Sequence, residues 1–243
     1  MNLILLEDSD FDGNGLARLG GRRARHVREV HRAQPGDELV VGRVNQGVGL
    51  GKVVASAAAE VVLEVRLDEP PPPASGIELL LAMPRPKILR RVLQATASLG
   101  IKRIVLVNSY RVEKSYFDSP LLAPEELREH LVLGLEQARD TLLPEVRVEK
   151  RFKPFVEDSL EGLWAGARRL IAHPVGGQTL TEELTGRQSE RAVVAIGPEG
   201  GWIPYEVEML EARGFARFSL GPRILRVDVA VPYVIAQLDL ARR

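Results

Sequence analysis

Hydrophobic and polar residues alternate differently in the two parts of the chain. The first part carries short apolar runs, separated by turn residues, at positions 3–6, 38–44, 48–55 and 61–67. Such runs, together with one basic helical segment, predict a small β-barrel over residues 1–69. Four consecutive prolines follow within residues 70–76. Polyproline favours an extended spacer, so we expect a linker between two domains there.

From residue 77 onward, strand-like and helix-like segments alternate. A continuous apolar run typical of a buried parallel strand covers residues 77–83, and further strands are predicted over residues 101–107, 145–150, 168–172 and 191–196. Helices that begin with proline or end at glycine are predicted over residues 86–99, 124–139 and 204–213. This alternation predicts an α/β domain over residues 77–243, with a mainly parallel sheet covered on both faces.

The last helical segment, residues 227–240, is apolar on almost every side. Apart from the hydroxyl of Tyr233, its polar side chains are those of Asp228, Gln237 and Asp239. A helix of this kind must be buried on several sides. Either it packs wholly into its own subunit, or part of it packs against a partner.

Two glycine-rich segments of the second part each follow an apolar run: residues 196–204 and 219–226. Because the carboxyl ends of parallel strands meet at one edge of a sheet, we expect both loops to line one ligand site. Glycine lets a ligand approach the main chain closely. Neither loop has the residue order of a P-loop or a dinucleotide fingerprint, which favours a nucleoside over a triphosphate. Alternatively, Gly200 and Gly201 form an ordinary tight turn before Pro204 starts a helix.

The composition narrows the chemistry. The chain contains no cysteine, which excludes disulfides and thiolate metal sites, and its four scattered histidines predict no metal site. No apolar stretch is long enough to span a membrane, and the first residues lack the features of a signal peptide. We therefore expect a soluble, cytoplasmic protein.

Positive charge is concentrated near the N-terminus, although the net charge of the chain is zero. Residues 18–32 contain six arginines and a single glutamate. Clustered arginines are typical of phosphate contacts, which predicts RNA binding by Arg22, Arg23, Arg25, Arg28 and Arg32. The alternative is a solvated helix face whose charges only keep the protein soluble.

The two glycine loops carry a family resemblance. Residues 196–201 and 220–226 resemble the paired signature of the RsmE family, the 16S ribosomal RNA uridine N3-methyltransferases of the SPOUT superfamily. Weaker likeness extends over His26–Arg32, Gly36–Asp37, Leu99–Ile104 and Glu136–Pro144. The chain departs from the family pattern at Asn2–Leu6, at Ser98 and at Val227–Ala230, and these departures affect the exact RNA target rather than the loops.

The resemblance implies a SPOUT-type domain with a deep trefoil knot, preceded by a PUA-like RNA-binding barrel, in a homodimer. It implies S-adenosylmethionine as methyl donor, no metal, and ribosomal RNA or the small ribosomal subunit as partner. The cofactor-binding residues that it implies are Ala172, His173, Ile196, Gly197, Glu199, Gly200, Gly201, Leu220, Gly221, Ile224 and Leu225.

Three charged residues of the loops are candidates for catalysis. Arg223 and Arg226 are suited to contact the base or its phosphate, and Glu199 to orient the donor or accept a proton. Glu199 could equally cap the following helix or bind loop amides. Two other functions stay open: a SPOUT enzyme that methylates ribose 2′-hydroxyls, and an RNA-binding protein without activity.

Overall fold

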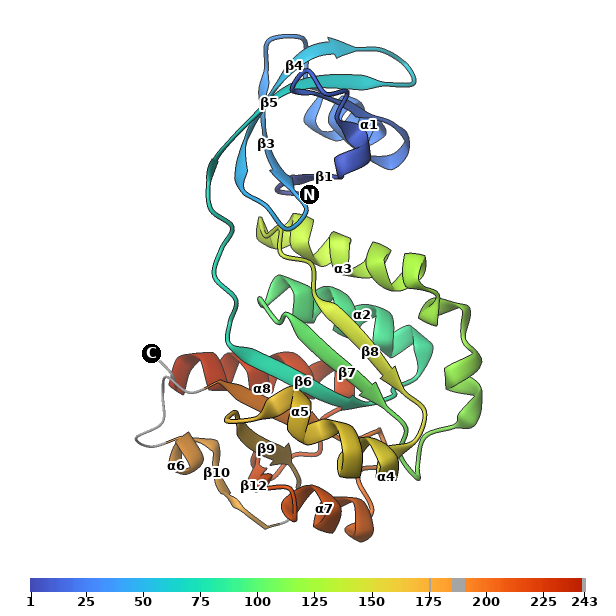
Figure 1. The fold of residues 1–243 in the computed structure, drawn as a ribbon, viewed down its shortest axis with the longest axis vertical. Coiled ribbons are helices and arrows are strands. Elements are labelled where there is room, and N and C mark those ends of the chain that lie inside the picture. The colour runs from blue at the N-terminus through green and yellow to red at the C-terminus, as the bar shows by residue number, and fades with distance from the viewer. Residues whose placement is uncertain (175, 185–190, 242–243) are drawn as a thin grey trace. The chain divides into compact units, whose positions relative to one another are not determined.

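The protein folds as two compact units. The computed structural model describes residues 1–174, 176–184 and 191–241 (Figure 1). Met1–Pro73 and Val132–Leu143 form the N-terminal unit, and Ala74–Leu131 and Pro144–Arg243 form the C-terminal unit. The first division lies within the proline-rich run. The sequence pattern gave no sign that Val132–Leu143 returns to the N-terminal unit.

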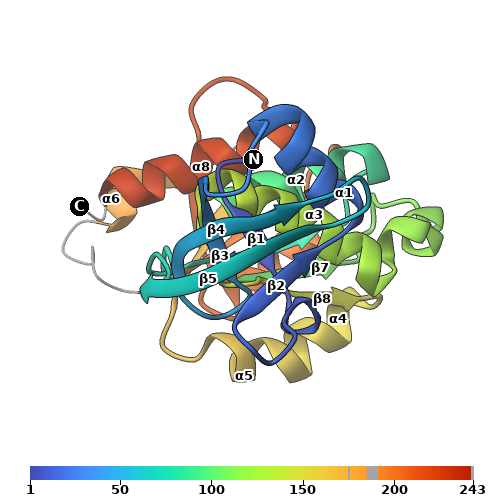
Figure 2. The same cartoon turned by 90° about the horizontal axis from the view of Figure 1, so that it is seen from above.

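The N-terminal unit is built on a five-stranded sheet in the order β1-β3-β4-β5-β2 (Figure 2). Its strands are β1 (Ile4–Leu6), β2 (Leu16–Leu19), β3 (Glu38–Arg43), β4 (Val48–Ser56) and β5 (Val61–Glu69). β1 pairs with β3 in parallel, and the remaining neighbours are antiparallel. The sequence pattern predicted four of these strands but not β2.

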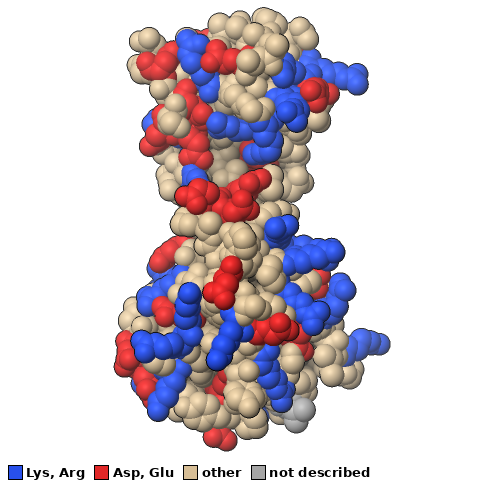
Figure 3. Space-filling view, turned by 90° about the vertical axis from the view of Figure 1, so that its right-hand side faces the viewer, with Lys and Arg blue, Asp and Glu red and all other residues tan. Residues whose placement is uncertain are grey.

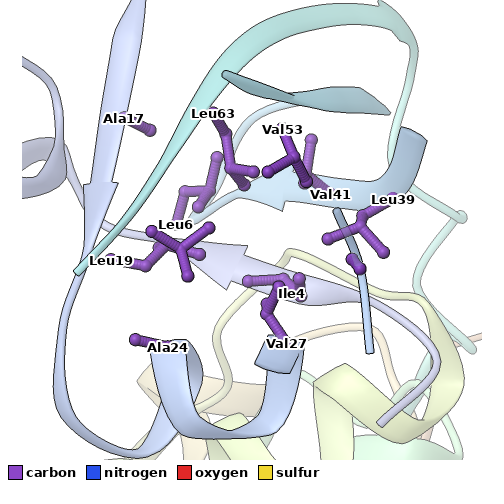
Figure 4. Packing of buried hydrophobic residues seen from close by; sticks show 12 residues of the cluster. Ile4, Leu6, Ala17, Leu19, Ala24, Val27, Leu39, Val41, Val53 and Leu63 are labelled. Atoms are coloured by element: carbon purple, nitrogen blue, oxygen red, sulfur yellow. The ribbon is translucent and has the colours of Figure 1, made fainter. Parts of the chain in front are cut away.

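All five strands contribute side chains to one hydrophobic core (Figure 4). Ile4, Val41 and Leu63 pack there with Ala24 and Val27 from the helical segment. That segment consists of α1 (Gly21–His26) and the π-helical turn η2 (Val27–His31). It is shorter than the basic helix expected within residues 18–32, because its first residues belong to β2. The sheet therefore curls around a core that the helical segment closes.

The end of helix α3 (Pro124–Ala138) belongs to this unit through Glu136. The carbonyl oxygen of Glu136 accepts hydrogen bonds from the backbone N–H groups of Asn2 and Leu3, each at 3.0 Å. Its buried carboxylate lies 2.9 Å from Arg22. Burial raises the pKa of Glu136, and the positive charge of Arg22 opposes that shift. Residues 132–143 are thereby fixed to the first strand of the chain.

The C-terminal unit contains a seven-stranded sheet in the order β10-β12-β9-β11-β6-β7-β8, with every pair parallel. The strands are β6 (Ile77–Ala82), β7 (Arg103–Val107), β8 (Glu145–Glu149), β9 (Arg168–Ala172), β10 (Gln178–Thr179), β11 (Ala192–Ile196) and β12 (Ala216–Ser219). β6, β7 and β11 are buried almost throughout, because helices cover both faces. The mainly parallel α/β sheet predicted from the sequence is present.

Helices α2 (Pro86–Ser98) and α8 (Val227–Ala241) lie on one face of this sheet (Figure 1). Helices α4 (Phe152–Pro154), α5 (Leu160–Trp164) and α7 (Pro204–Glu211) lie on the other face (Figure 1). Right-handed crossovers explain the places of α2, α5 and α7, because the chain crosses the sheet in one direction from β6 to β7 and in the other from β8 to β9 and from β11 to β12. Helix α8 follows the last strand and is not part of a crossover. The remaining helical turns are η1 (Asp8–Asp10), η3 (Lys114–Asp118), η4 (Pro120–Leu122), η5 (Phe155–Ser159) and α6 (Leu180–Leu184).

Helix α8 is buried on one side only. Val234 and Leu238 are fully buried and pack within the unit, where α8 contacts α2 and β11. On the other side, Val229, Tyr233 and Leu240 are 42%, 45% and 73% exposed. These three residues follow helical spacing, so an apolar stripe of α8 faces away from its own subunit.

Candidate functional site

A cavity of about 230 Å³ lies at the carboxyl edge of the parallel sheet. The loops after the neighbouring strands β9, β11 and β12 line it, together with the first turn of α8. The eleven residues that the sequence pointed to all line this cavity. They are Ala172 and His173 at the end of β9, then Ile196, Gly197, Glu199, Gly200 and Gly201 at the end of β11 and in its loop, and Leu220, Gly221, Ile224 and Leu225 after β12.

Two glycines of these loops have left-handed backbone conformations. Gly201 has a φ of 74°, and its N–H donates to the carbonyl of Pro198 at 2.8 Å. Gly221 has a φ of 98°, and its N–H donates to Ser219 Oγ at 3.2 Å. A Cβ at either glycine would meet no protein atom within 4 Å. Both glycines therefore form tight turns and leave main-chain atoms open to the cavity.

Trp202, which the sequence analysis did not single out, packs against the first glycine loop. Its side chain is 5% exposed, and a Cβ added to Gly197 would lie 3.1 Å from its Cδ1 atom. Its ring lies 5.8 Å from the ring of Phe152, which follows β8. A side chain at position 197 would therefore press against Trp202, which favours glycine there.

Glu206 joins the loop after β7 to the start of α7. This carboxylate is 2% exposed and accepts hydrogen bonds from Tyr110 N at 2.8 Å and Ser109 Oγ at 3.3 Å. It also accepts from Ile203 N at 3.0 Å, as expected of a glutamate in the first turn of a helix that starts at Pro204. A capping pattern in the sequence could have pointed to Ile203, but not to the distant loop.

Glu199 lies on the rim of the cavity and binds a loop amide. Its Oε1 accepts the backbone N–H of Arg85 at 3.4 Å, from the segment between β6 and α2. It does not cap the following helix, because Glu206 binds the N–H of Ile203 there. The sequence left two structural roles open for Glu199, a helix cap and a hydrogen bond to a loop amide. The structure contains the second.

The two arginines of the second loop differ in position. Arg223 is exposed and lines the cavity. Arg226 is not among the lining residues, and its guanidinium lies 3.3 Å from the carboxylate of Asp228. Asp228 is nearly buried and also receives Arg91 of α2 at 3.2 Å. Two of the three catalytic candidates, Glu199 and Arg223, therefore line the cavity, and the third, Arg226, does not.

Three of the five arginines predicted to contact RNA have partners in the N-terminal unit. Arg23 donates to both oxygens of Asp10, at 2.6 and 2.7 Å, and to the carbonyl of Leu5 at 2.8 Å. Arg22 pairs with the buried Glu136. The guanidinium of Arg28 binds the carbonyls of residues 57 and 58. Their charges therefore stabilise the unit itself.

The other two arginines of this group, Arg25 and Arg32, are exposed. Within residues 1–174, 176–184 and 191–241, neither guanidinium takes part in an ion pair or hydrogen bond. These two cations are free to bind an anionic partner. The sequence predicted the arginine cluster, but it could not separate the paired from the unpaired members.

Two further properties concern the described part of the chain. No three side chains of His, Cys, Asp or Glu come together there in a way that could hold a metal ion. None of the helices described is both long and apolar enough to cross a membrane.

Residues 71–239 match the family model of the RNA methyltransferase domain. This match covers well over half of the chain, including both glycine loops. The chain belongs to the RNA methyltransferase family. The family resemblance predicted from the loops is confirmed at this level.

Named relatives match this RNA methyltransferase over nearly its whole length. The ribosomal RNA small subunit methyltransferase E of Treponema pallidum is 29% identical over 233 residues, which cover 95% of this chain and 87% of the relative. Ribosomal RNA small subunit methyltransferase E 1 of Borreliella burgdorferi is 23% identical, with 95% and 94% covered. The crystal structure of ribosomal RNA small subunit methyltransferase E from Neisseria gonorrhoeae, bound to S-adenosyl methionine, superposes with a TM-score of 0.78 at 20% identity, covering 99% and 97%. That structural likeness shows a shared fold.

Proposed function

We propose that this protein is an RsmE-type enzyme that transfers the methyl group of S-adenosylmethionine to N3 of a uridine in 16S ribosomal RNA. The observation that carries the proposal is the cavity in which all three predicted loops converge. The names of the relatives from Treponema and Borreliella, and the S-adenosyl methionine bound in the Neisseria structure, support the substrate and the methyl donor.

The lining of the cavity fits the methyl donor. Leu220, Ile224 and Leu225 offer apolar surface to an adenine ring. Gly197 and Gly201 offer main-chain groups without side chains in front of them. When bound, S-adenosylmethionine supplies a methyl group activated by a sulfonium. The protein residues then hold the donor and the acceptor nitrogen in line. Such positioning can lower the activation free energy by about 7–11 kcal/mol.

The acceptor nitrogen determines what else the site must do. Uridine N3 carries a proton and is a poor nucleophile until that proton leaves, and the negative charge then spreads to the adjacent carbonyl oxygens. As the N3–methyl bond forms, the sulfur–methyl bond breaks and its electron pair stays on sulfur. We assign the stabilisation of the charge to Arg223 and the acceptance of the proton to Glu199, both on the cavity.

We assign Arg226 to a backbone phosphate of the RNA. Its guanidinium contacts Asp228 and its side chain is 74% exposed, so it remains accessible to a ligand from the solvent. The absence of cysteine from the whole chain supports a nitrogen or oxygen acceptor over pyrimidine C5.

The N-terminal unit, which we expected over residues 1–69, is proposed to be a PUA-like RNA-binding barrel. Its five strands surround a single core, as in a closed or nearly closed sheet. The free guanidinium groups of Arg25 and Arg32 offer two phosphate contacts. Arg22, Arg23 and Arg28 each have a partner within the unit, so we assign the phosphate contacts to the other two arginines.

We further propose that the protein is a homodimer that pairs through the exposed stripe of α8. Val229, Tyr233 and Leu240 would be covered by the same residues of a second copy, because a two-fold interface uses one patch twice. For the C-terminal unit, we also propose the knotted chain path of the SPOUT type that the family resemblance implies. With ribosomal subunits as substrate, we place the enzyme in the cytoplasm.

Calorimetry and methyl transfer test this function together. Titration of S-adenosylmethionine into the purified protein should give one site per chain. Donor with a labelled methyl group should then transfer the label to 16S ribosomal RNA within small subunits. A protein that binds RNA but neither binds the donor nor transfers label would be an inactive RNA-binding relative, and the proposal would be wrong.

A further inference from the structure

Two loops beside the cavity leave the sheet side by side. After β7, the backbone N–H of Asn108 donates to the carbonyl of Glu149 at 2.9 Å, and its side-chain Nδ2 donates to the carbonyl of Lys150 at 3.1 Å. These bonds extend the β7–β8 pairing past the end of both strands. Residues 108–111 and residues 150–151 are therefore neighbours at the carboxyl edge of the sheet.

Both loops are fixed to the first glycine loop of the cavity. Arg111 Nη1 binds the carbonyl of Gly200, and a Cβ at Gly200 would lie 3.0 Å from Arg111 Cδ. Phe152, which follows residues 150–151, packs against Trp202. Buried Glu206 completes the connection through the backbone N–H of Tyr110. We call residues 108–111 and 150–151 the platform. These contacts attach the platform to the first glycine loop of the cavity.

The platform presents an exposed aromatic ring. Tyr110 is 80% exposed although its own N–H binds a buried carboxylate and the preceding Ser109 is 4% exposed. The other exposed tyrosines described, Tyr205 and Tyr233, are 49% and 45% exposed. An aromatic ring held out into solvent on a fixed backbone contributes little to the core, but it can stack on a base at low entropic cost.

The two loops also carry unpaired positive charges. Lys114, Lys150 and Arg151 are exposed, and none of them has an ion pair within the described residues. On the side of the C-terminal unit seen in Figure 3, lysine and arginine side chains are numerous. A carboxylate of the same loop, Glu113, forms a hydrogen bond with Tyr116. Burial, and after it this hydrogen bond, raise the pKa of Tyr116.

We propose that Tyr110 stacks on a nucleobase of the substrate RNA next to the methylated uridine, while Lys150 and Arg151 hold adjacent phosphates. An exposed aromatic ring among free cations is the combination that binds single-stranded RNA, because every base has a stacking face and every nucleotide a phosphate. The proposal rests on the proposed function, since the cavity beside the platform must receive a base that is turned out of its helix.

Three substitutions at position 110 test the stacking. Tyr110→Ala should raise the KM for small subunits about 5- to 150-fold, the range measured when a base-stacking ring is removed. Tyr110→Phe keeps the ring and should stay near wild type. Tyr110→Leu keeps apolar bulk without the ring and should resemble the alanine variant. All three should bind S-adenosylmethionine and melt as the wild type does, because the side chain is exposed.

The flanking charges have their own readout. Substitution of Lys150 and Arg151 by glutamine should weaken RNA binding and reduce the slope of log affinity against log salt by about 0.7 per lost phosphate contact. An unchanged KM for Tyr110→Ala, or equal losses for Tyr110→Phe and Tyr110→Ala, would overturn the stacking role.

The same experiments separate this inference from the proposed function. If the wild type transfers methyl groups to 16S ribosomal RNA but Tyr110→Ala is equally efficient, only the platform is wrong. If the wild type transfers none, the proposed function fails. The platform is then judged by direct binding of single-stranded RNA to the position-110 variants: loss with alanine and leucine but not phenylalanine supports it, and equal affinity overturns it.

Discussion

Replacement of Gly201 by valine should abolish cofactor binding at a moderate cost in stability. Gly201 has a φ of 74°, a conformation that costs an L-residue about 1–2 kcal/mol, and a β-branched one at the upper end. No protein atom lies within 4 Å of the new Cβ, so this strain is the main penalty for folding. For a chain of this size, each kcal/mol lowers the Tm by about 2–4 °C, which predicts a loss of about 2–8 °C.

The substitution should also act directly on the cofactor site, apart from its effect on folding. Gly201 lines the cavity, and the valine methyl groups would occupy space next to main-chain atoms that we assign to the donor. We expect the affinity for S-adenosylmethionine, measured by calorimetry, to fall by at least about 10-fold, or about 1.4 kcal/mol.

Gly166→Val provides the matched control. Gly166 has a φ of 72°, also has no protein atom within 4 Å of its Cβ position, and does not line the cavity. Both variants should lose a similar amount of Tm, and only Gly201→Val should lose cofactor binding. Wild-type affinity in Gly201→Val, or an equal loss of affinity in both variants, would refute the assigned pocket.

Three further predictions concern other parts of the molecule. The double variant Arg25→Gln, Arg32→Gln should bind RNA more weakly and with a flatter salt dependence, without a lower Tm. Arg23→Gln removes the arginine partner of Asp10 and should lower the free energy of unfolding by about 1–3 kcal/mol in a urea titration. Burial raises the pKa of Glu136 in the folded state. The stability that this carboxyl group contributes is therefore fully present below its unfolded pKa of 4.5, and it is lost as the pH rises through the folded-state pKa. Glu136→Gln should therefore gain stability relative to the wild type with rising pH, and a constant difference would contradict this. Tyr233→Glu should give a folded monomer in light scattering, and a variant that remains dimeric would show that α8 is not the interface.

The sequence pattern predicted most local structure of the C-terminal unit. Helix α2 was expected over residues 86–99 and runs from Pro86 to Ser98, because proline marks its first turn and Gly100 follows its end. The strands β6, β7 and β11 were recognisable because they are buried on both faces and hence apolar throughout. The first glycine loop was recognisable as a ligand loop because it follows such a strand, β11, whereas the second follows the less buried β12 and was recognisable by its glycine and proline residues.

Long-range pairing was not predictable. The position of β11 between β9 and β6 depends on contacts between segments far apart in the chain. The same holds for the return of Val132–Leu143 to the N-terminal unit, and for Glu206, whose role depends on a loop about a hundred residues earlier. The short strand β2 was missed because Arg18, at its centre, belongs to an arginine-rich run that resembles a helix.

Nucleoside mass spectrometry after a reaction in vitro tests the central claim most directly. Purified protein and S-adenosylmethionine are incubated with small ribosomal subunits from a strain that lacks this protein, and the 16S ribosomal RNA is then digested to nucleosides. The account predicts that 3-methyluridine appears and that Gly201→Val protein fails to form it. A 2′-O-methylated nucleoside in its place, or no new methylated nucleoside, would contradict the account.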